Sequence, residues 1–215
     1  MPVPRALAAL RDPRPEARAV GAQALLDFGV RKQPIPPEAV AALAAALRDE
    51  GARVRLVAAH AFVRIAPSGD ATSAAAALDA ATRDADPEVR AASLRALAKW
   101  APQPRATLER ALDDPSAGVR IEAVRALAGA PEGAAIVARH LEVESSRAVV
   151  LAALDALAGT GVAAPARFLD DAEPALRCRA GVLAGDAPRD CGRLRAAAAT
   201  RSAPLRALWE LSQPP

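Results

Sequence analysis

Aromatic side chains are almost absent from this chain of 215 residues. Phe, Trp and Tyr together account for 2% of the sequence, and Tyr does not occur at all. A core with so few large rings has to be built from Ala, Leu and Val, and Ala has the highest helix propensity of all residues. Binding hot spots draw on Trp, Tyr and Arg, of which only Arg is plentiful here. Any binding surface is therefore expected to give moderate affinity.

Cysteine and long apolar runs are scarce as well. Cys178 and Cys191, without a companion histidine cluster, make neither a zinc site nor a disulfide framework. Cys178 falls at a helix-core position, which predicts a buried free thiol. No apolar run reaches the length of a membrane span, and the N-terminal residues lack the apolar stretch of a signal peptide. We therefore expect a cytoplasmic protein with no metal, no cofactor and no membrane contact.

Lysine is nearly missing, so arginine supplies most of the positive charge, and the net charge is +3. The charge is unevenly distributed. Residues 109–175 carry six arginines and eleven carboxylates, whereas residues 176–206 carry seven arginines and two carboxylates. A basic C-terminal segment beside an acidic middle can steer a charged partner. The alternative is an ordinary solvated surface with internal ion pairs.

One pattern recurs about every thirty residues: a turn, then Val-Arg, then a helix rich in Ala and Leu. The Val position is called slot 0, and the other positions of each copy are counted from it. The anchors are Ala17-Arg18, Val54-Arg55, Val89-Arg90, Val119-Arg120, Val149-Val150 and Leu176-Arg177, with a partial copy at Leu205-Arg206. Such a repeat predicts an all-α fold, an α-solenoid of about six to seven stacked helical hairpins, in a single domain spanning 1–215. The predicted repeats are 4–29, 37–66, 70–101, 104–130, 132–160 and 162–186, with a partial repeat at 189–211.

The helix after each anchor carries an apolar face. Eight and eleven residues are close to whole helical turns, so slots 0, 8 and 11 lie on one face, which is expected to be buried. Slot 8 holds Leu25, Phe62, Leu97, Leu127 and Leu157 in the first five copies. Trp100 occupies slot 11 and is therefore expected in the core.

Proline punctuates the spaces between the helices. The three prolines of the connector 31–37 exclude a continuous helix there. Asp-Pro pairs occur at 12–13, 86–87 and 114–115. An aspartate can cap the following helix, and a proline is preset for its first turn. Each pair therefore predicts a helix start.

This organisation resembles the HEAT-repeat family, in the short form also found in phycobilisome-lyase-like repeat proteins. The motif Asp-x-(Asp)-Pro-x-x-Val-Arg-x-x-Ala-x-x-Ala-Leu carries the resemblance, which covers nearly the whole chain. It implies that second helices line a concave face, and that the repeated arginine pairs with the turn aspartate and joins adjacent repeats. These arginines are Arg18, Arg55, Arg90, Arg120, Arg177 and Arg206. Two copies depart from the pattern, because Val150 replaces the arginine and the sixth copy is one residue short before Gly185.

Slots 6 and 10 of the second helices lie away from the buried face. In three consecutive copies they are basic, at His60, Arg64, Arg95, Lys99 and Arg125. This basic stripe is the predicted partner-binding surface, suited to an acidic protein segment or to a nucleic-acid backbone. The alternative is an ordinary solvated helix face. The row ends at Asp27 on one side and Asp155 on the other, which would confine a partner to the middle.

Apolar residues stand beside the stripe, at slots 2 and 5. They are Leu56, Leu94, Ile121, Val124, Leu151 and Leu154. They either pack between repeats or form a groove for an amphipathic helix. Trp209, near the C-terminus, either seals the end of the core or meets a partner.

Catalytic motifs are missing: there is neither a nucleophile elbow nor a phosphate-binding glycine loop. The leading hypothesis is a non-enzymatic scaffold that binds another protein on its concave face. The alternative is a solenoid that binds nucleic-acid backbones. The resemblance also admits a DNA glycosylase, which would need aromatics in the cleft, and a subunit of a bilin lyase, which would bind a tetrapyrrole. The sequence identifies neither of those sites, and it leaves the oligomeric state open.

Overall fold

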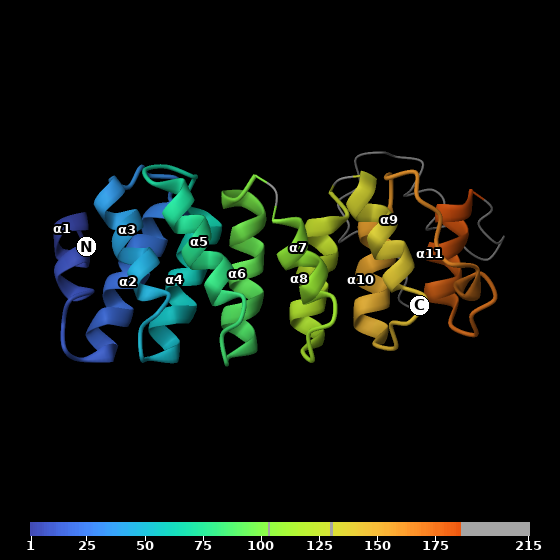
Figure 1. Cartoon of the computed structure of the whole chain (residues 1–215), viewed down its shortest axis with the longest axis horizontal. Helices are drawn as coiled ribbons and strands as arrows, with labels where there is room; N and C mark the ends of the chain where they lie inside the picture. Colours follow the sequence, from blue (N-terminus) through green and yellow to red (C-terminus); the bar gives the residue numbers. More distant parts are fainter. Residues whose placement is uncertain (103, 130, 186–215) are drawn as a thin grey trace. The chain divides into compact units, whose positions relative to one another are not determined.

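The computed structural model describes residues 1–102, 104–129 and 131–185, and every regular element in them is a helix. Figure 1 shows the helices in chain order. They are α1 (Val3–Ala9), α2 (Pro15–Val30), α3 (Pro37–Ala46), α4 (Ala52–Arg64), α5 (Ala71–Ala81), α6 (Pro87–Trp100), α7 (Arg105–Ala111), α8 (Ala117–Leu127), α9 (Pro131–His140), α10 (Arg147–Leu157), the short 3-10 helix η1 (Ala166–Phe168) and α11 (Pro174–Ala184). The predicted fold class, an all-α repeat of helical hairpins, is confirmed.

Prolines and glycine set several helix ends. Helix α2 stops at Val30 and α3 starts at Pro37, so the proline-rich connector interrupts the helices as predicted. Proline also occupies the first position of α2, α6 and α11, where its missing N–H costs nothing. Gly185 ends α11 with a φ of 76°, a left-handed conformation that glycine adopts readily.

The prediction for the Asp-Pro pairs is right at one place only. Asp86 caps α6 by accepting a hydrogen bond from the N–H of Glu88. Asp12 and Asp114 stand two residues earlier relative to their helices, and each accepts the N–H of the residue two positions on. These two carboxylates therefore hold the turn that precedes the helix and do not cap it.

The first compact unit, Met1–Ala126, is built from hairpins that stack in chain order. Helix α1 packs on α2, α3 on α4 and α5 on α6, while the second helices form their own row, α2 on α4 and α4 on α6. The core is made mainly of small residues, and alanine is the most frequent member of the buried cluster. Small side chains let neighbouring helix backbones approach closely.

The buried face of the second helices is the one that the sequence predicts. In this unit the slot 8 residues Leu25, Phe62 and Leu97 are buried. Trp100 is buried too, and its ring meets that of Phe62 edge to face, with ring centres 5.0 Å apart. The expected core position of Trp100 is confirmed.

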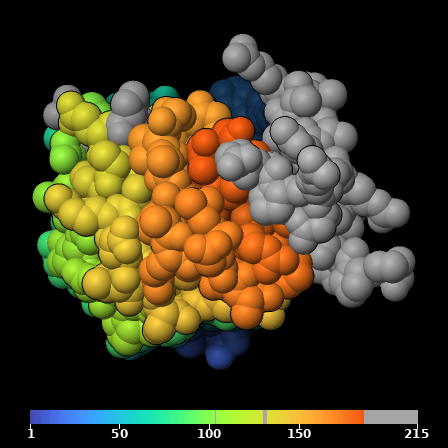
Figure 2. Space-filling view, turned by 90° about the vertical axis from the view of Figure 1, so that its right-hand side faces the viewer, coloured from blue at the N-terminus to red at the C-terminus, as the bar shows by residue number. Residues whose placement is uncertain are grey.

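The second compact unit begins at Leu127 and includes α9, α10, η1 and α11. Figure 2 looks onto this unit, whose residues run from yellow to orange-red. Its described core includes Leu141, Leu154, Leu157 and Phe168. The hairpin predicted at 162–186 has only η1 in place of its first helix. Two glycines and one proline within residues 159–165 leave too little helix-forming sequence for a longer one.

Cys178 is buried in α11, as predicted, but the prediction that its thiol is free is wrong, because Cys178 is disulfide-bonded. A helix-core position predicts burial and says nothing about which other cysteine lies within bonding distance. Cys191, Arg206, Trp209 and the predicted repeat at 189–211 lie outside the described residues.

Candidate functional site

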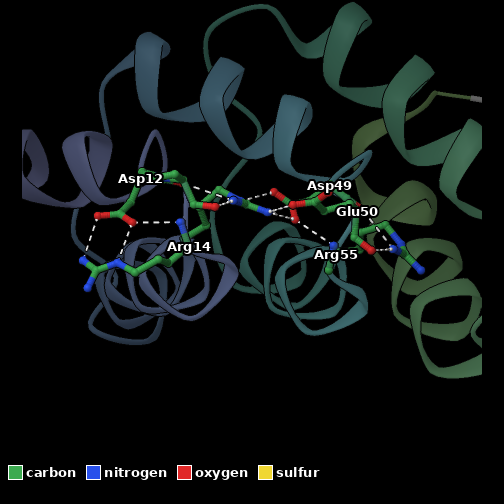
Figure 3. Close-up of polar contacts among 8 residues, drawn as sticks. Asp12, Arg14, Asp49, Glu50 and Arg55 are labelled. Carbon is green, nitrogen blue, oxygen red and sulfur yellow. Dashed lines mark hydrogen bonds and ion pairs between the residues drawn. The ribbon is translucent and has the colours of Figure 1, made fainter.

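In the first three copies, the arginine at slot 1 joins its inter-helix turn to the turn of the next repeat. Arg18 donates from Nε and Nη2 to the Asp49 carboxylate at 2.6 and 2.9 Å, and from Nη1 to two carbonyls of its own turn. The pairs across repeats are Arg18–Asp49, Arg55–Asp84 and Arg90–Asp114, at 2.6, 2.7 and 2.8 Å. All six side chains are between 9% and 17% exposed. Figure 3 shows the contacts around Asp49 and Arg55.

The acceptor in these pairs stands at slot −5, where all six copies carry an acidic residue. Asp49 is typical: its Oδ1 accepts the N–H of Gly51 at 2.8 Å, which fixes the turn. The guanidinium of Arg18 lowers the pKa of Asp49. Burial raises the pKa of Asp84, but the hydrogen bonds from Arg55 and the backbone outweigh it, so that pKa is lowered as well. Asp49 and Asp84 are therefore held in their charged form.

In the later copies, the slot 1 arginine still donates hydrogen bonds to carbonyls of its own turn. Arg120 and Arg177 each donate from Nη1 to the carbonyl at slot −5, at 2.8 and 2.6 Å. In the fifth copy, where Val150 has no such donor, Arg167 of η1 reaches the equivalent carbonyl of Glu144 at 2.8 Å. An arginine from the following segment thus replaces the missing one, a substitution that the repeat pattern did not predict.

In the first turn, the acidic residue at slot −5 is bound by an arginine of its own turn. Asp12 stands at slot −5, and Arg14 of the same turn binds it from Nε and Nη2 at 3.0 and 3.1 Å (Figure 3). The hydrogen bonds from Arg14 lower the pKa of Asp12 to about 2.

The exposed surface of α4, α6 and α8 carries the predicted basic stripe and is called the second-helix face below. All five predicted residues are exposed on it: His60 and Arg64 on α4, Arg95 and Lys99 on α6, and Arg125 on α8. Because α4 packs on α6, residues that are far apart in the sequence lie on neighbouring helices of one unit. All five belong to the first compact unit.

A buried carboxylate stands beneath the stripe and was not predicted. Glu122 of α8 accepts hydrogen bonds from Arg95 Nε and Nη2 at 2.8 and 2.5 Å. Arg125 Nη1 binds the same carboxylate at 3.2 Å. The Glu122 side chain is 8% exposed, whereas those of Arg95 and Arg125 are 51% and 60% exposed. Two half-exposed guanidinium groups therefore share one buried acid.

Lys99 is also held in place. Its Nζ donates to the carbonyl of Ile65 at 2.8 Å and approaches that of Val63 at 3.4 Å, at the end of α4. The neighbouring Trp100 donates from Nε1 to the Phe62 carbonyl at 2.9 Å. Both α6 side chains thus satisfy carbonyls that the end of a helix leaves without partners. Lys99 contributes charge to the face while tying α6 to α4.

The α4 end of the face carries less charge than its sequence implies. Burial lowers the pKa of His60, and the nearby Arg95 and Arg64 lower it further, so His60 is neutral at pH 7. Of the two predicted stripe residues on α4, the exposed Arg64 is therefore the one that supplies positive charge.

The two acidic residues predicted to end the stripe both have polar partners. Asp27 of α2 accepts a hydrogen bond from Gln23 at 3.0 Å. Asp155 of α10 pairs with Arg179 at 2.6 Å, and Arg179 is only 5% exposed. The Asp155–Arg179 pair uses the same two slots as Arg95 and Glu122, slot 6 and the next copy's slot 3, with the charges exchanged.

The apolar residues next to the stripe divide into two groups. Leu94, Val124 and Leu154 are at most 1% exposed, so they pack inside and cannot line an accessible groove. Leu56, Ile121 and Leu151 are partly exposed. Of these, Leu56 and Ile121 belong to the unit that carries the stripe.

Two searches of the described residues were negative. No group of three or more His, Cys, Asp or Glu side chains could hold a metal ion in residues 1–102, 104–129 and 131–185. Within the same residues, no helix has the length and apolar character that crossing a membrane requires.

Comparison with sequence families gives one family for most of the chain. The family model described as HEAT repeats matches residues 3–98 and residues 74–158. No curated protein matches the chain.

Two solved structures have a similar fold. One is an engineered protein with 19% sequence identity and a TM-score of 0.54. The match covers 98% of this chain and 93% of the engineered protein. The other is a designed armadillo repeat protein in complex with the peptide (KR)4, with 18% identity, 99% coverage of this chain, 100% of its own and a TM-score of 0.54. At such low identity the likeness extends to the fold alone.

Proposed function

Because this chain belongs to the HEAT repeat family, we propose that it is a non-enzymatic scaffold that binds another protein on the second-helix face. The observation that carries the proposal is the exposed row of basic side chains on α4, α6 and α8, which the repeat itself does not require. The slot 1 arginines are engaged in the turns, whereas Arg64, Arg95 and Arg125 extend to the surface. Helical-repeat folds use such rows as extended binding surfaces.

The expected partner is an acidic segment of a protein. The designed armadillo repeat protein with a similar fold holds a short peptide, (KR)4, which supports a peptide as the class of ligand. That peptide is basic, whereas the face described here is basic itself, so the peptide expected here has the opposite charge. Leu56 and Ile121 add partly exposed apolar area beside the charges, which suits an acidic segment with an apolar side.

The scaffold proposal includes an expected location. The cytoplasm is predicted from the lack of a signal-peptide stretch and of a membrane-length apolar run, yet Cys178 is disulfide-bonded, and such bonds persist mainly in oxidising compartments. Lysis of cells directly into denaturant with iodoacetamide, which exposes the buried Cys178, followed by mass spectrometry, tests this directly. A cytoplasmic protein should yield alkylated Cys178, and an unmodified Cys178 would favour an oxidising compartment.

The test of the binding face uses a defined acidic probe. Fluorescence anisotropy with a fluorescein-labelled octaglutamate peptide compares the wild type with the double variant Arg95→Glu/Arg125→Glu. We expect the double variant to bind at least about tenfold more weakly, because two charge-assisted contacts become repulsive. The matched control, Arg5→Glu/Arg48→Glu, makes the same charge change at two exposed positions away from this face and should keep most of the affinity.

Three results would count against the proposal. Equal losses in both double variants would mean that net charge alone governs the probe. Binding unchanged in Arg95→Glu/Arg125→Glu would exclude the second-helix face. Tighter binding to a labelled single-stranded DNA than to the peptide, with a steep fall in affinity as salt rises, would favour a nucleic-acid backbone as the ligand.

A further inference from the structure

Glu122 is the acid that the repeat does not explain. It stands at slot 3 of its copy, and small apolar residues fill that slot in most other copies. The slot 3 residues are Val20, Val57, Ala92, Glu122, Ala152 and Arg179. A residue needed to build every repeat would recur in every repeat, as the slot 1 arginine nearly does. Glu122 therefore serves something local to α6 and α8.

Its surroundings show what it does to its neighbours. Arg95 Nε and Nη2 are both used on the Glu122 carboxylate, and so is Arg125 Nη1. A guanidinium group has five N–H donors in a rigid plane. Each arginine therefore keeps N–H donors that the Glu122 carboxylate does not use, Nη1 of Arg95 and Nη2 of Arg125. Arg95 is held by two hydrogen bonds to Glu122 and Arg125 by one. The three side chains together carry one net positive charge.

The Asp155–Arg179 pair in the second compact unit provides an internal comparison. It uses the same two slots, and its arginine is 5% exposed. Such an arginine has almost no accessible donor. The cluster of Arg95, Glu122 and Arg125 has two bases for one acid, and both bases are more than half exposed. The surplus and the exposure distinguish it from a joint between repeats.

We propose that Glu122 is a positioning residue that orients Arg95 and Arg125 into a receptor for the carboxylate of an acidic side chain on a protein partner. The inference rests on the proposed function, since it specifies how the second-helix face recognises its ligand. Holding both guanidinium planes in advance removes part of the entropy that long side chains lose when they bind. A carboxylate presented from outside completes an arrangement in which each arginine lies between two acids.

A carboxylate fits this cluster better than a nucleic-acid backbone. The cluster has one surplus charge, and His60 beside it is neutral at pH 7. Tight backbone binding requires several phosphates to be neutralised at once. Base stacking requires exposed aromatic rings, and on α4 and α6 both rings, Phe62 and Trp100, are buried.

The decisive variant removes a negative charge from a site that binds a negative ligand. Glu122→Gln keeps the size of the side chain but no longer holds both arginines by charge. Asp27→Asn, on the neighbouring α2, makes the same change in net charge away from the cluster. If Glu122 positions the arginines, Glu122→Gln should bind labelled octaglutamate about five- to tenfold more weakly than the wild type, although its net charge is more favourable. Asp27→Asn should bind equally well or slightly more tightly.

A second variant keeps the test valid if Glu122→Gln folds poorly. Arg95→Glu/Glu122→Arg exchanges the charges, retains the net charge, and reproduces the polarity of the natural Asp155–Arg179 pair. We expect it to melt within a few degrees of the wild type but to lose at least about tenfold in affinity for the probe. Thermal melts of all variants are recorded beside the titrations.

The outcomes separate this inference from the proposed function. If Glu122→Gln binds the probe as tightly as Asp27→Asn does, Glu122 does not position a receptor, and the inference is overturned while the basic face stands. If the charge exchange leaves the affinity unchanged, the receptor is not at this cluster. If Arg95→Glu/Arg125→Glu binds like the wild type, the proposed function itself fails.

Discussion

Arginine has two different roles in this chain, and the slot it occupies decides which one. At slot 1 its guanidinium group lies between carbonyls of its own turn and, in the first three copies, the carboxylate of the next turn, with little exposure. At slot 6, Arg95 and Arg125 are also ion-paired but remain more than half exposed. The number of neighbouring acids and the exposure therefore separate a structural arginine from one available to a ligand.

The slot 1 role predicts a stability defect. Arg90→Ala removes two hydrogen bonds to Asp114 and two to carbonyls of its own turn, and it leaves a little-exposed carboxylate without its partner. We expect the free energy of unfolding to fall by about 2–4 kcal/mol, below the full value for a completely buried pair because both side chains are partly exposed. Urea denaturation followed by circular dichroism measures this.

A control for Arg90→Ala lies in the same hairpin, in the turn between α5 and α6. Arg83→Ala removes an arginine whose side chain is 56% exposed and whose ion-pair partner, Asp79, stands four residues earlier, near the end of α5. Such a pair contributes about 0.5 kcal/mol or less. Equal effects of the two substitutions, or a loss of octaglutamate binding by Arg90→Ala without a loss of stability, would contradict the structural assignment of slot 1.

At the scale of elements, the turn between the two helices of a hairpin is the unit that repeats most faithfully. Its acid holds the turn through a backbone N–H and, in three copies, binds the arginine of the preceding repeat. The pKa of Asp49 is lowered by Arg18. A carboxyl group with a lowered pKa in the folded state stabilises the fold at pH values above its unfolded pKa, and this contribution is lost as the pH falls through the folded pKa.

This sign gives a pH-dependent prediction for Asp49→Asn. At pH 7 the variant should lose about 1–3 kcal/mol in the free energy of unfolding, because charge-assisted hydrogen bonds become neutral ones. The difference from the wild type should shrink below about pH 4, where the Asp49 carboxyl of the unfolded chain begins to be protonated while the folded one, with its lowered pKa, stays ionised. Urea titrations at several pH values between 3 and 7 measure it. A constant difference over this range would mean that the ionised Asp49 contributes nothing to stability.

Much of this element-level structure could be predicted from the sequence. The repeat and its slots predict the helices, the buried slot 8 and the core position of Trp100, because helical periodicity and burial depend on neighbours within one copy. The contact of Glu122 with Arg95 and that of Lys99 with the end of α4 could not be predicted. They depend on which side chains meet across helices, and a period of about thirty residues does not specify this.

Two features that depart from the predictions also depend on contacts between separate segments. The repeat pattern identifies Val150 as irregular but does not identify Arg167, since Arg167 lies on η1, outside the second helices from which the slots are counted. A helix-core position likewise predicts the burial of Cys178 but not its disulfide bond. In both cases the missing information concerns distance in space between segments that are separate in the sequence.

At the scale of the whole molecule, stability is expected to divide along the chain. Stacked repeats contact mainly their neighbours, so their cooperativity is local. The chain forms two compact units, Met1–Ala126 and Leu127–Pro215. The large buried cluster described for the first unit draws on residues from Ala6 to Trp100 and none beyond Ala126. The first unit therefore has a core of its own.

This division predicts that a fragment of residues 1–126 folds and binds without the rest of the chain. It contains the three slot 1 pairs, the core of the first unit and the whole receptor cluster, since Arg95, Glu122 and Arg125 all precede its end. We expect a helical far-UV spectrum, one cooperative urea transition, and an octaglutamate affinity within about twofold of the full chain.

A fragment that folds but no longer binds the probe would mean that residues beyond 126 supply part of the binding surface. A fragment that does not fold would mean that the first unit depends on the second for its stability. Because the two failures differ in the far-UV spectrum, one preparation tests the autonomy of the unit and the location of the site together.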